Sequence, residues 1–455
     1  MKLRHGGIAA LAVLALSLPC LRASAQTGGA GDEPSDEKTK PKEAEPAPPA
    51  EPTEVPAPTP PPAPEPERAS YIPPPATPAR IENSSGSIQI GILAQPAYEI
   101  AGAPDAEKTT KNIFLRRFRL MVGGTLFKTI EFFFDADWPN LFKLDSGETG
   151  KFDKYGPGLI VQDAYVTFKP FGALLKIDAG FMLPPLSHNG LESAAKLYGG
   201  DYFVNTFRRS VTTNADPFTN AGESPVGRDL GAQLRVLAVN GHIDLRGGVF
   251  QGHRLGAVPQ STMTPATVGG LNAPRVAGRL QLNLLDAEPG FFYQGTYHGT
   301  RKVVSIGGFI DYQSPYKYFG GDLIIDLPIG PGVLTAQGTF GQWDGGTYTD
   351  ANGIITPFIQ LPKERVLMGE LGYLIGPIML SPIVRVERLT SYARDMTTGE
   401  SPTFAFPSEN RFGGGLAFWP YGHNSNLKAS FTRVERSPAP HAFNVINVQW
   451  QVYYY

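Results

Sequence analysis

Apolar and polar residues alternate with a period of two along most of the chain after about residue 85. Residues 88–94 place Ile88, Ile90 and Ile92 on one face, and residues 446–454 repeat this arrangement near the C-terminus. Such alternation predicts β-strands with one apolar face and one polar face. The polar face repeatedly carries charged side chains, and the predicted strands are longer than the five or six residues usual in globular proteins.

The pattern predicts about sixteen strands. They lie near residues 87–98, 113–127, 129–138, 160–169, 174–183, 226–238, 240–251, 275–285, 302–313, 317–327, 332–343, 365–375, 378–389, 410–419, 426–435 and 443–454.

The connections between these strands alternate between long and short. Long connections follow residues 138, 183, 251, 343 and 389, whereas the intervening turns are tight, as at residues 328–331 and 376–377. Two connections depart from this rule: 285–302 is long where a short turn is expected, and 313–317 is short where a long loop is expected. Short turns at one end and long loops at the other are typical of outer-membrane barrels. The predicted fold class is therefore all-β, a transmembrane antiparallel β-barrel of about 16 strands, closed because lipid cannot satisfy an open sheet edge.

A second architecture fits the same strands. An exported β-sandwich that binds carbohydrate or cell wall, without transporting anything, would also alternate apolar and polar positions. The two differ in which face meets water, because a barrel carries its apolar belt outside and its charges inside, and a sandwich reverses this.

The first 25 residues have the features of a secretory signal peptide. Lys2 and Arg4 precede an apolar run over residues 8–18, and the small residues 23–25 form the expected cleavage site. Cys20, the single cysteine, would leave with this peptide, so the exported chain would have no thiol. The alternative, a lipidated Cys20, places Pro19 where a small residue is expected.

Residues 26–80 are rich in proline, alanine and glutamate. Such a composition cannot bury a core and favours an extended, polyproline-like chain. We expect three regions: a signal peptide at 1–25, a disordered periplasmic linker at 26–80 and an outer-membrane barrel at 81–455. The linker is expected to be a spacer, or else a tether that contacts the cell wall.

Composition excludes several classes of function. Charged residues are 18 % of the chain, below the roughly 25 % of soluble proteins. Lys+Arg (40) and Asp+Glu (42) nearly balance, so nucleic acid is not an expected partner. The 7 histidines are scattered without metal-ligand spacing, so no metal, cofactor or enzymatic activity is expected. His242 beside Asp244 is the one pair with a catalytic appearance.

Several short segments, in order along the chain, resemble the phosphate-selective porin family of the O and P type. They are Phe114–Leu120, Gly124–Lys128, Glu131–Asp135, Gln162–Val166, Gly180–Pro184, Phe207–Ser210, Gly227–Gly231 and Gly295–Gly299. The resemblance covers roughly residues 85–455 and implies a trimeric, sixteen-stranded outer-membrane channel whose third loop folds inward. It also implies that basic residues guide anions through the pore. Two features depart from the family: Tyr455 lies one residue beyond the phase of the apolar face, and the family has no long proline-rich linker.

The candidate pore-lining or constriction residues are basic. They are Arg117, Arg119, Lys196, Arg208, Arg209, Arg235, Arg246, Arg275, Arg279 and Arg385. Guanidinium groups suit anions and phosphate. Carboxylates at Glu131, Asp135, Asp137, Asp163, Asp178, Asp244 and Glu387 share their phase. Two interpretations therefore stay open: arginines paired with carboxylates that stiffen the wall, or a lumen with a net attraction for anions.

The predicted function is passive diffusion of small hydrophilic solutes through the outer membrane, with a modest preference for anions such as phosphate or polyphosphate. The segment 186–219, which carries Lys196, Arg208 and Arg209, is expected to fold inward and narrow the pore or else to form an external loop. Aromatic runs at 132–134, 291–293 and 453–455 are expected in the girdles at the membrane surfaces. Expected partners are outer-membrane lipid, small anionic solutes and two further copies of the chain in a homotrimer.

Overall fold

The structure is a computed structural model of the whole chain. It describes residues 72–73, 75–103, 106–143, 158–204, 206, 227–252, 273–345, 347–349, 355–357, 363–392, 408–437 and 442–455. The predicted signal peptide, nearly all of the predicted linker, and Arg208 and Arg209 lie outside the described residues.

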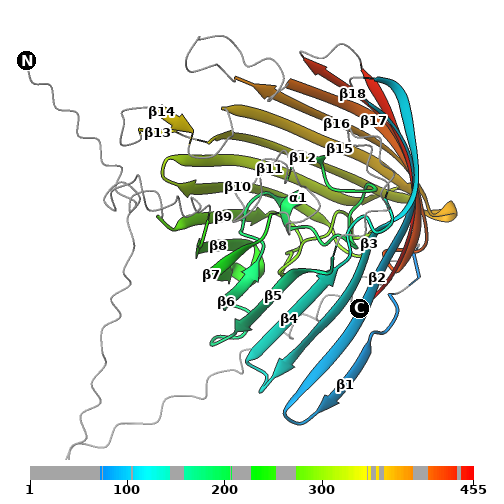
Figure 1. Cartoon of the computed structure of the whole chain (residues 1–455). Coiled ribbons are helices and arrows are strands. Elements are labelled where there is room, and N and C mark those ends of the chain that lie inside the picture. Colours follow the sequence, from blue (N-terminus) through cyan, green and yellow to red (C-terminus); the bar gives the residue numbers. More distant parts are fainter. Residues whose placement is uncertain are drawn as a thin grey trace, which may run out of the picture. The chain divides into compact units, whose positions relative to one another are not determined.

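Sixteen antiparallel strands close into a barrel (Figure 1). Each strand pairs with the next along the sheet, and β19 pairs with β2 to complete the ring. The strands are β2 (Gly86–Ala103), β3 (Ala106–Leu126), β4 (Ile130–Asp137), β5 (Ile160–Phe168), β6 (Leu175–Met182), β7 (Asp229–Ala238), β8 (Ile243–Phe250), β9 (Arg275–Asn283), β10 (Val303–Gln313), β11 (Tyr316–Ile329), β12 (Gly332–Asp344), β15 (Glu364–Ile375), β16 (Leu380–Ser391), β17 (Ser408–Tyr421), β18 (Ser425–Ser437) and β19 (Phe443–Tyr454). Each corresponds to one predicted strand, so the predicted fold class is confirmed.

The remaining elements are short. They are β1 (Ala79–Asn83), the two-stranded pair β13 (Thr347–Thr349) and β14 (Ile355–Pro357), the helix α1 (His188–Leu191), and the 3-10 turns η1 (Val239–Gly241) and η3 (Gly376–Ile378). None of the described helices has the length and apolar character needed to cross a membrane.

The strand β1 was not predicted, and it changes the boundary of the barrel. It pairs with the first residues of β2, from Ala79 opposite Ile90 to Asn83 opposite Gly86. The strand β19 ends further along the same edge of β2, with Tyr454 opposite Ile92. The expected boundary between residues 80 and 81 therefore falls inside a strand, and the folded unit begins before it.

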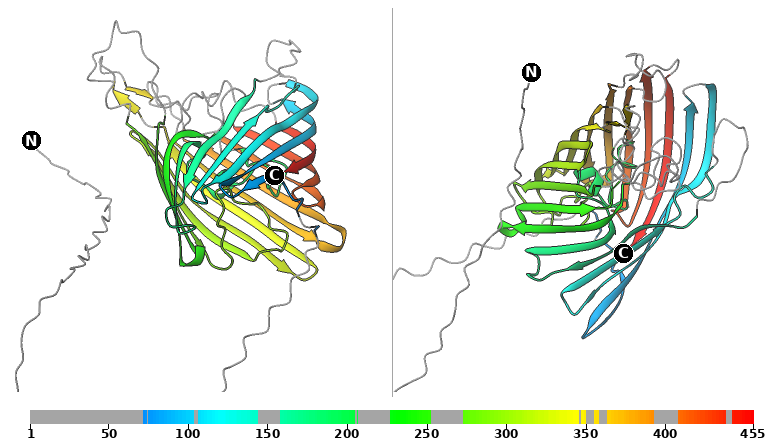
Figure 2. Two further views of the ribbon diagram at one scale, coloured as in Figure 1. Left: turned by 90° about the horizontal axis from the view of Figure 1, so that it is seen from below. Right: turned by 60° about the vertical axis from the view of Figure 1, so that its left-hand side comes forward.

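The two anomalous connections have structural explanations. The strands β10 and β11 pair up to Gln313 and Tyr316, so their link is a tight hairpin between long strands. The connection 284–302 is long because it folds into the lumen, where Glu288, Tyr293 and Tyr297 are buried. Figure 2 shows the barrel from two further sides.

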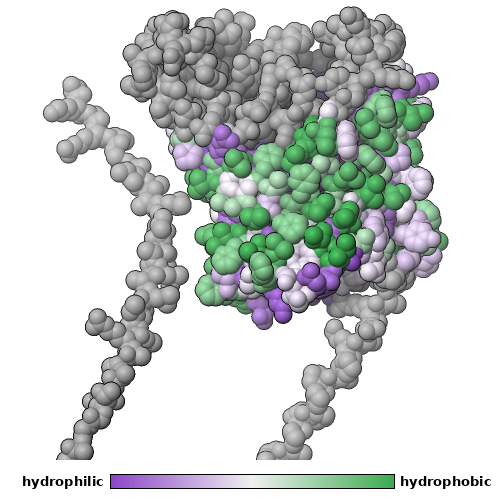
Figure 3. All heavy atoms as spheres, turned by 60° about the horizontal axis from the view of Figure 1, so that its bottom comes forward, coloured by the Kyte–Doolittle hydropathy of each residue, from purple (hydrophilic) through white to green (hydrophobic). Residues whose placement is uncertain are grey.

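The apolar face of the sheet points outward. In β10, Ile306 and Ile310 are about half exposed, whereas the alternating Asp311 and Gln313 are buried inside. Figure 3 shows apolar side chains gathered over the face of the barrel that it presents. A closed ring with this belt spans a membrane, because water would not tolerate so large an apolar surface. The alternative β-sandwich is therefore wrong.

Two segments fill much of the lumen, one from each end of the barrel. Residues 183–204, which include α1, enter from the end with the long loops, and residues 284–302 enter from the end with the short turns (Figure 1). They meet through three backbone hydrogen bonds: Tyr293 donates to Leu191 (2.9 Å), Ser193 to Tyr293 (3.1 Å), and Gly295 to Lys196 (2.9 Å).

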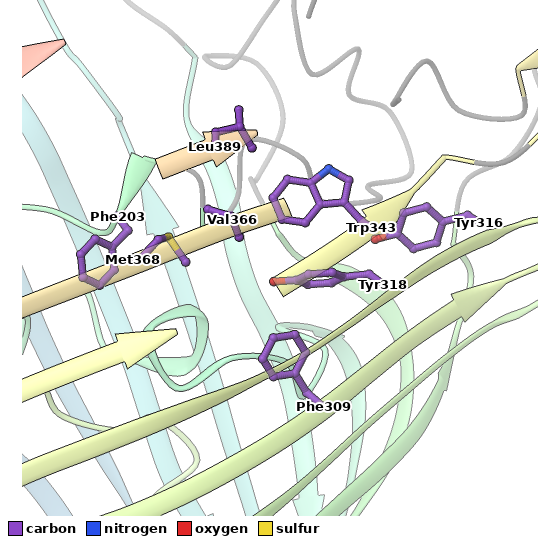
Figure 4. Close-up of a cluster of buried hydrophobic side chains, with 8 residues drawn as sticks. All are labelled: Phe203, Phe309, Tyr316, Tyr318, Trp343, Val366, Met368 and Leu389. Carbon is purple, nitrogen blue, oxygen red and sulfur yellow. The ribbon is translucent and has the colours of Figure 1, made fainter. Parts of the chain in front are cut away.

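An apolar cluster packs the lumen beside β10, β11, β12, β15 and β16. Its members are Phe203, Phe309, Tyr316, Tyr318, Trp343, Val366, Met368 and Leu389 (Figure 4). Phe203 comes from the inward segment, and the others point inward from the wall. These buried side chains pack together on this side of the lumen.

A second cluster forms near the short-turn end. Ile72 packs there with Tyr198 and Trp419, and the amide of Ala76 donates to Asn424 Oδ1 (3.1 Å). Gly422 lies against Ile72 with a positive φ of 56°, and a Cβ added there would be 2.8 Å from Ile72 Cγ2. Ile72 and Ala76 therefore lie at this mouth of the barrel.

The expected aromatic girdle is wrong for the run 291–293, and in the run 453–455 Tyr453 and Tyr455 face the lumen. Phe291 and Phe292 are half-buried and Tyr293 is buried, all within the inward segment 284–302. The expectation fails because it assumes that this connection is a turn at the membrane surface. In the run 132–134, Phe134 points outward and Phe133 into the lumen.

Candidate functional site

Two cavities lie in the lumen of the described barrel, one on each side of the inward segment 183–204. The first, called the outer cavity, has a volume of about 420 Å³. It lies toward the long loops, because Asn140 and Lys143 line it. The strands β16 to β19 also line it, together with the ends of β2 and β3 that are nearest to these loops. Three consecutive glycines of β17, residues 413–415, line it, so no side chains project from this part of its wall.

The second, called the inner cavity, has a volume of about 370 Å³. It lies toward the short turns, because Gln89, Tyr453 and Tyr455 line it. Both volumes are within the range of cavities that hold small molecules.

The segment Gly199–Tyr202 separates the two cavities. Tyr202 lines both of them, and its hydroxyl donates to the carbonyl of Glu192 (2.6 Å). Asp201 beside it binds Arg116 (2.7 Å) and Arg117 (2.5 Å). Burial alone would raise the pKa of Asp201, but these two guanidinium groups hold that pKa well below its usual range. The segment is thus fastened to β3 by a charged carboxylate.

The strand arginines predicted to line the pore all point into the lumen, and each contacts a carboxylate. Arg117 contacts Asp201 (2.5 Å), Arg119 contacts Asp135 (2.8 Å) and Asp137 (2.9 Å), Arg235 contacts Asp178 (2.6 Å), Arg246 contacts Asp244 (2.8 Å), Arg275 contacts Asp311 (2.6 Å) and Asp229 (3.2 Å), Arg279 contacts Asp322 (2.7 Å), and Arg385 contacts Glu370 and Glu387 (both 3.7 Å).

These contacts favour the first interpretation of the arginines, a wall stiffened by ion pairs. A buried guanidinium is stable only when a carboxylate and further hydrogen bonds compensate for lost water. Arg279 meets this need by donating to both oxygens of Asp322 and to the carbonyl of Leu186 in the inward segment. The arginines therefore hold the wall and the inward segment together.

Two lysines lie near the dividing segment without a carboxylate at ion-pair distance among the described residues. Lys428 of β18 donates to the carbonyls of Leu197 (2.7 Å) and Gly199 (2.8 Å) and lines the outer cavity. Lys196 lines the inner cavity, and burial lowers the pKa of its ammonium group. Sequence reasoning identified Lys196 but missed Lys428, which occupies an inward position of its strand.

A buried histidine joins the two inward segments. His188 Nδ1 lies 3.1 Å from Glu192, and its Nε2 lies 3.1 Å from Glu288 in the segment 284–302. The ring also stacks on Tyr293 at 4.6 Å. Burial alone would lower the pKa of His188, but Glu288 and Glu192 outweigh burial and raise that pKa to about 9. We call this contact the histidine latch.

His242 and Asp244, the pair considered as candidate catalytic residues, bind different partners in the structure. His242 Nδ1 lies 2.7 Å from the carbonyl oxygen of Asn283, whereas Asp244 accepts from Arg246 and from Tyr293. Among the described residues, no group of three or more His, Cys, Asp or Glu side chains is arranged to hold a metal ion.

The arrangement as a whole is that of a porin-like outer-membrane barrel. It combines sixteen closed strands, an apolar exterior, a charged interior and an inward segment between two cavities.

No family model matches the sequence, and no curated protein matches it. The solved structures similar to it include the outer membrane channel DcaP of Acinetobacter baumannii, with 11 % identity, a TM-score of 0.49, and coverage of 82 % of this chain and 99 % of that chain. Salmonella typhi OmpF has 10 % identity, a TM-score of 0.48 and coverage of 82 % and 100 %. A loop-deletion mutant of Vibrio cholerae OmpT has 11 % identity, a TM-score of 0.47 and coverage of 82 % and 100 %. Because these identities and TM-scores are low, the evidence for a function comes from the residues of this barrel.

Proposed function

We propose that this chain is a bacterial outer-membrane channel for passive diffusion of small hydrophilic solutes, with a modest preference for small anions. The observation that carries the proposal is a pair of cavities in the lumen, on either side of the inward segment 183–204. They lie on one side of the barrel, along β2 to β5 and β16 to β19, and among the described residues the segment Gly199–Tyr202 lies between them. Solutes pass from the outer to the inner cavity when this segment shifts.

The anion preference comes from Lys196 and Lys428. The arginines are compensated by carboxylates, whereas these two ammonium groups flank the dividing segment without one, in the part of the chain that the structure describes. A charge at a constriction selects ions of the opposite sign. The preference is modest because carboxylates also line both cavities. The segments that resemble the phosphate-selective porins support anion transport, but paired guanidinium groups do not form a phosphate site.

The proposal is tested by reversal potentials in planar bilayers under a KCl gradient. The wild-type protein should conduct, and the sign of its reversal potential should show that anions are more permeant than cations. The double variant Lys196→Met and Lys428→Met should move it toward zero or cation preference. A control, Lys317→Met, changes an exposed lysine of β11 and should leave the potential unchanged.

Absence of any conductance from correctly folded protein would contradict the channel function. An unchanged potential in the double variant would remove the two lysines from the ion path.

Three further features belong to this proposal. Residues 1–25 direct export, residues 26 to about 71 form a periplasmic spacer, and three copies assemble in the membrane as in the family that the sequence resembles. Arg208 and Arg209, which lie outside the described residues, stay proposed constriction residues.

A further inference from the structure

The inner cavity contains two buried carboxylate oxygens that lack a hydrogen-bond partner. Asp135 of β4 and Asp163 of β5 lie directly opposite each other in the sheet. Each uses its Oδ2 to bind an arginine, Arg119 (2.8 Å) and Arg228 (3.2 Å) respectively. The Oδ1 atom of each is buried and has no partner among the described residues. Because buried acceptors without partners are costly, these two atoms indicate a ligand that donates hydrogen bonds.

Aromatic rings form another part of the same cavity. Phe133, Phe292 and Tyr455 meet edge to face, with centroids 5.8 Å and 5.7 Å from Phe133. All three line the cavity and are only partly buried, so their surfaces remain available. The negative face of an aromatic ring attracts the weakly positive hydrogens of C–H groups.

The charges of the cavity cancel. Arg119, Arg228 and Lys196 line it together with Asp135, Asp163 and Glu192. A cation would meet the basic groups and an anion the acidic ones, each at a Coulomb cost. A neutral solute with several hydroxyl groups avoids both costs, because each hydroxyl can donate to a carboxylate and accept from Lys196.

We propose that the inner cavity is a binding subsite for neutral polyhydroxylated solutes of the mono- or disaccharide class. This inference rests on the proposed channel function and names a solute for it. The hydroxyls donate to Asp135 Oδ1 and Asp163 Oδ1, while the C–H face of the sugar ring packs on Phe292 and Phe133. Lys196 takes part in both the sugar subsite and the small-ion preference, whereas Lys428, which lines the outer cavity, bears on the small-ion preference alone.

The test is the reduction of the KCl current in planar bilayers by glucose and by maltose. Polyethylene glycol of the same hydrodynamic size serves as the comparison, because its ether oxygens accept hydrogen bonds but do not donate them. The sugars should reduce the current in a saturable way, beyond the effect of the polymer. Phe292→Ala should weaken the apparent affinity by about 3- to 10-fold, the effect of losing one aromatic contact. Phe319→Ala, the same truncation on the exposed face of β11, should not.

Heat-modifiable migration on gels reports whether each variant folds. If Phe292→Ala does not fold, Phe292→Leu keeps most of the volume without the ring and should show the same weakening. Sugar effects no greater than those of the polymer would overturn the inference, as would block by tetramethylammonium at lower concentrations than either sugar. Loss of all current in the wild type would instead contradict the channel function itself.

Discussion

At the scale of single residues, the lumen is governed by charge compensation. The period of two places the arginines of β3, β7, β8, β9 and β16 inside, so their orientation was predictable from the sequence. Their partners were not predictable. Arg279 of β9 and Asp322 of β11 meet across the intervening strand β10, and only the closed barrel fixes the register of these three strands. The Asp201 contacts depend further on an inward loop.

The buried pair of Arg279 and Asp322 should be a large determinant of stability. Both side chains are almost fully buried, so Arg279→Met leaves the Asp322 carboxylate without its guanidinium partner, with the His188 amide as a remaining donor, and should cost about 3 to 5 kcal/mol. Arg365→Met removes an exposed guanidinium that binds Gln342 and should cost less than about 1 kcal/mol. Urea unfolding of the barrel in detergent measures both, and equal midpoints for the two variants would contradict the assignment.

A charged residue introduced on the outward face should destabilise the barrel. Leu234 of β7 is about half exposed and points to lipid, as does Val448 of β19. Arginine at either position should cost about 2 to 4 kcal/mol if it lies at the bilayer midplane, and less near the edges. The same unfolding measurement in lipid vesicles checks this. Recovery of wild-type protein as a stable monomer without detergent would contradict the membrane assignment.

At the scale of elements, the two inward segments distinguish this barrel from an open pore. The length of the connection that begins at Pro184 allows an inward fold to be expected, whereas the length of 284–302 is only an irregularity in the strand pattern. Its excess length and its run Phe291–Tyr293 were the available signals. They were ambiguous, since aromatic residues near strand ends are also typical of membrane-surface girdles.

The histidine latch predicts a pH dependence. The pKa of His188 is raised from 6.5 to about 9, so the contribution of His188 to stability is full below about pH 6.5 and is lost as pH rises through about 9. Burial raises the pKa of Glu192 to about 7, so this carboxyl is already charged in the range where His188 loses its proton. Current noise from loop motion should therefore increase between about pH 8 and pH 10. His188→Gln, which retains neutral hydrogen bonds, should remove this transition. If the transition persists in His188→Gln, titratable groups other than His188 cause it.

At the scale of the whole molecule, the number, order and closure of the strands followed from periodicity and connection length. The strand β1 escaped detection because it has five residues and follows a proline-rich stretch. The filling of the lumen could not be predicted either, since it depends on which side chains meet across the barrel. Ile72 packing near Trp419 is the plainest case.

Two truncations test where the folded unit begins. A chain starting at Ile72 behind a fresh signal peptide should assemble and conduct like the wild type. A chain starting at Ser84 loses both β1 and the Ile72 contact with Trp419, so it should still close its sixteen strands but conduct more, because one mouth of the barrel is less filled. Single-channel conductance compares the two; equal values would show that Ile72 does not obstruct the path.

The central claim is that solutes pass the segment Gly199–Tyr202 rather than the opposite side of the lumen. The most direct measurement is block of single-channel current by a charged methanethiosulfonate reagent in single-cysteine variants that carry a Cys20→Ser background. A Cβ added at Gly200 meets no atom within 4 Å, and this residue lines the outer cavity, whereas Met368 is buried in the apolar cluster on the other side. The account predicts that the reagent reduces the current of Gly200→Cys and leaves that of Met368→Cys unchanged. Full modification of Gly200→Cys, verified by mass spectrometry, with no change in current would contradict it.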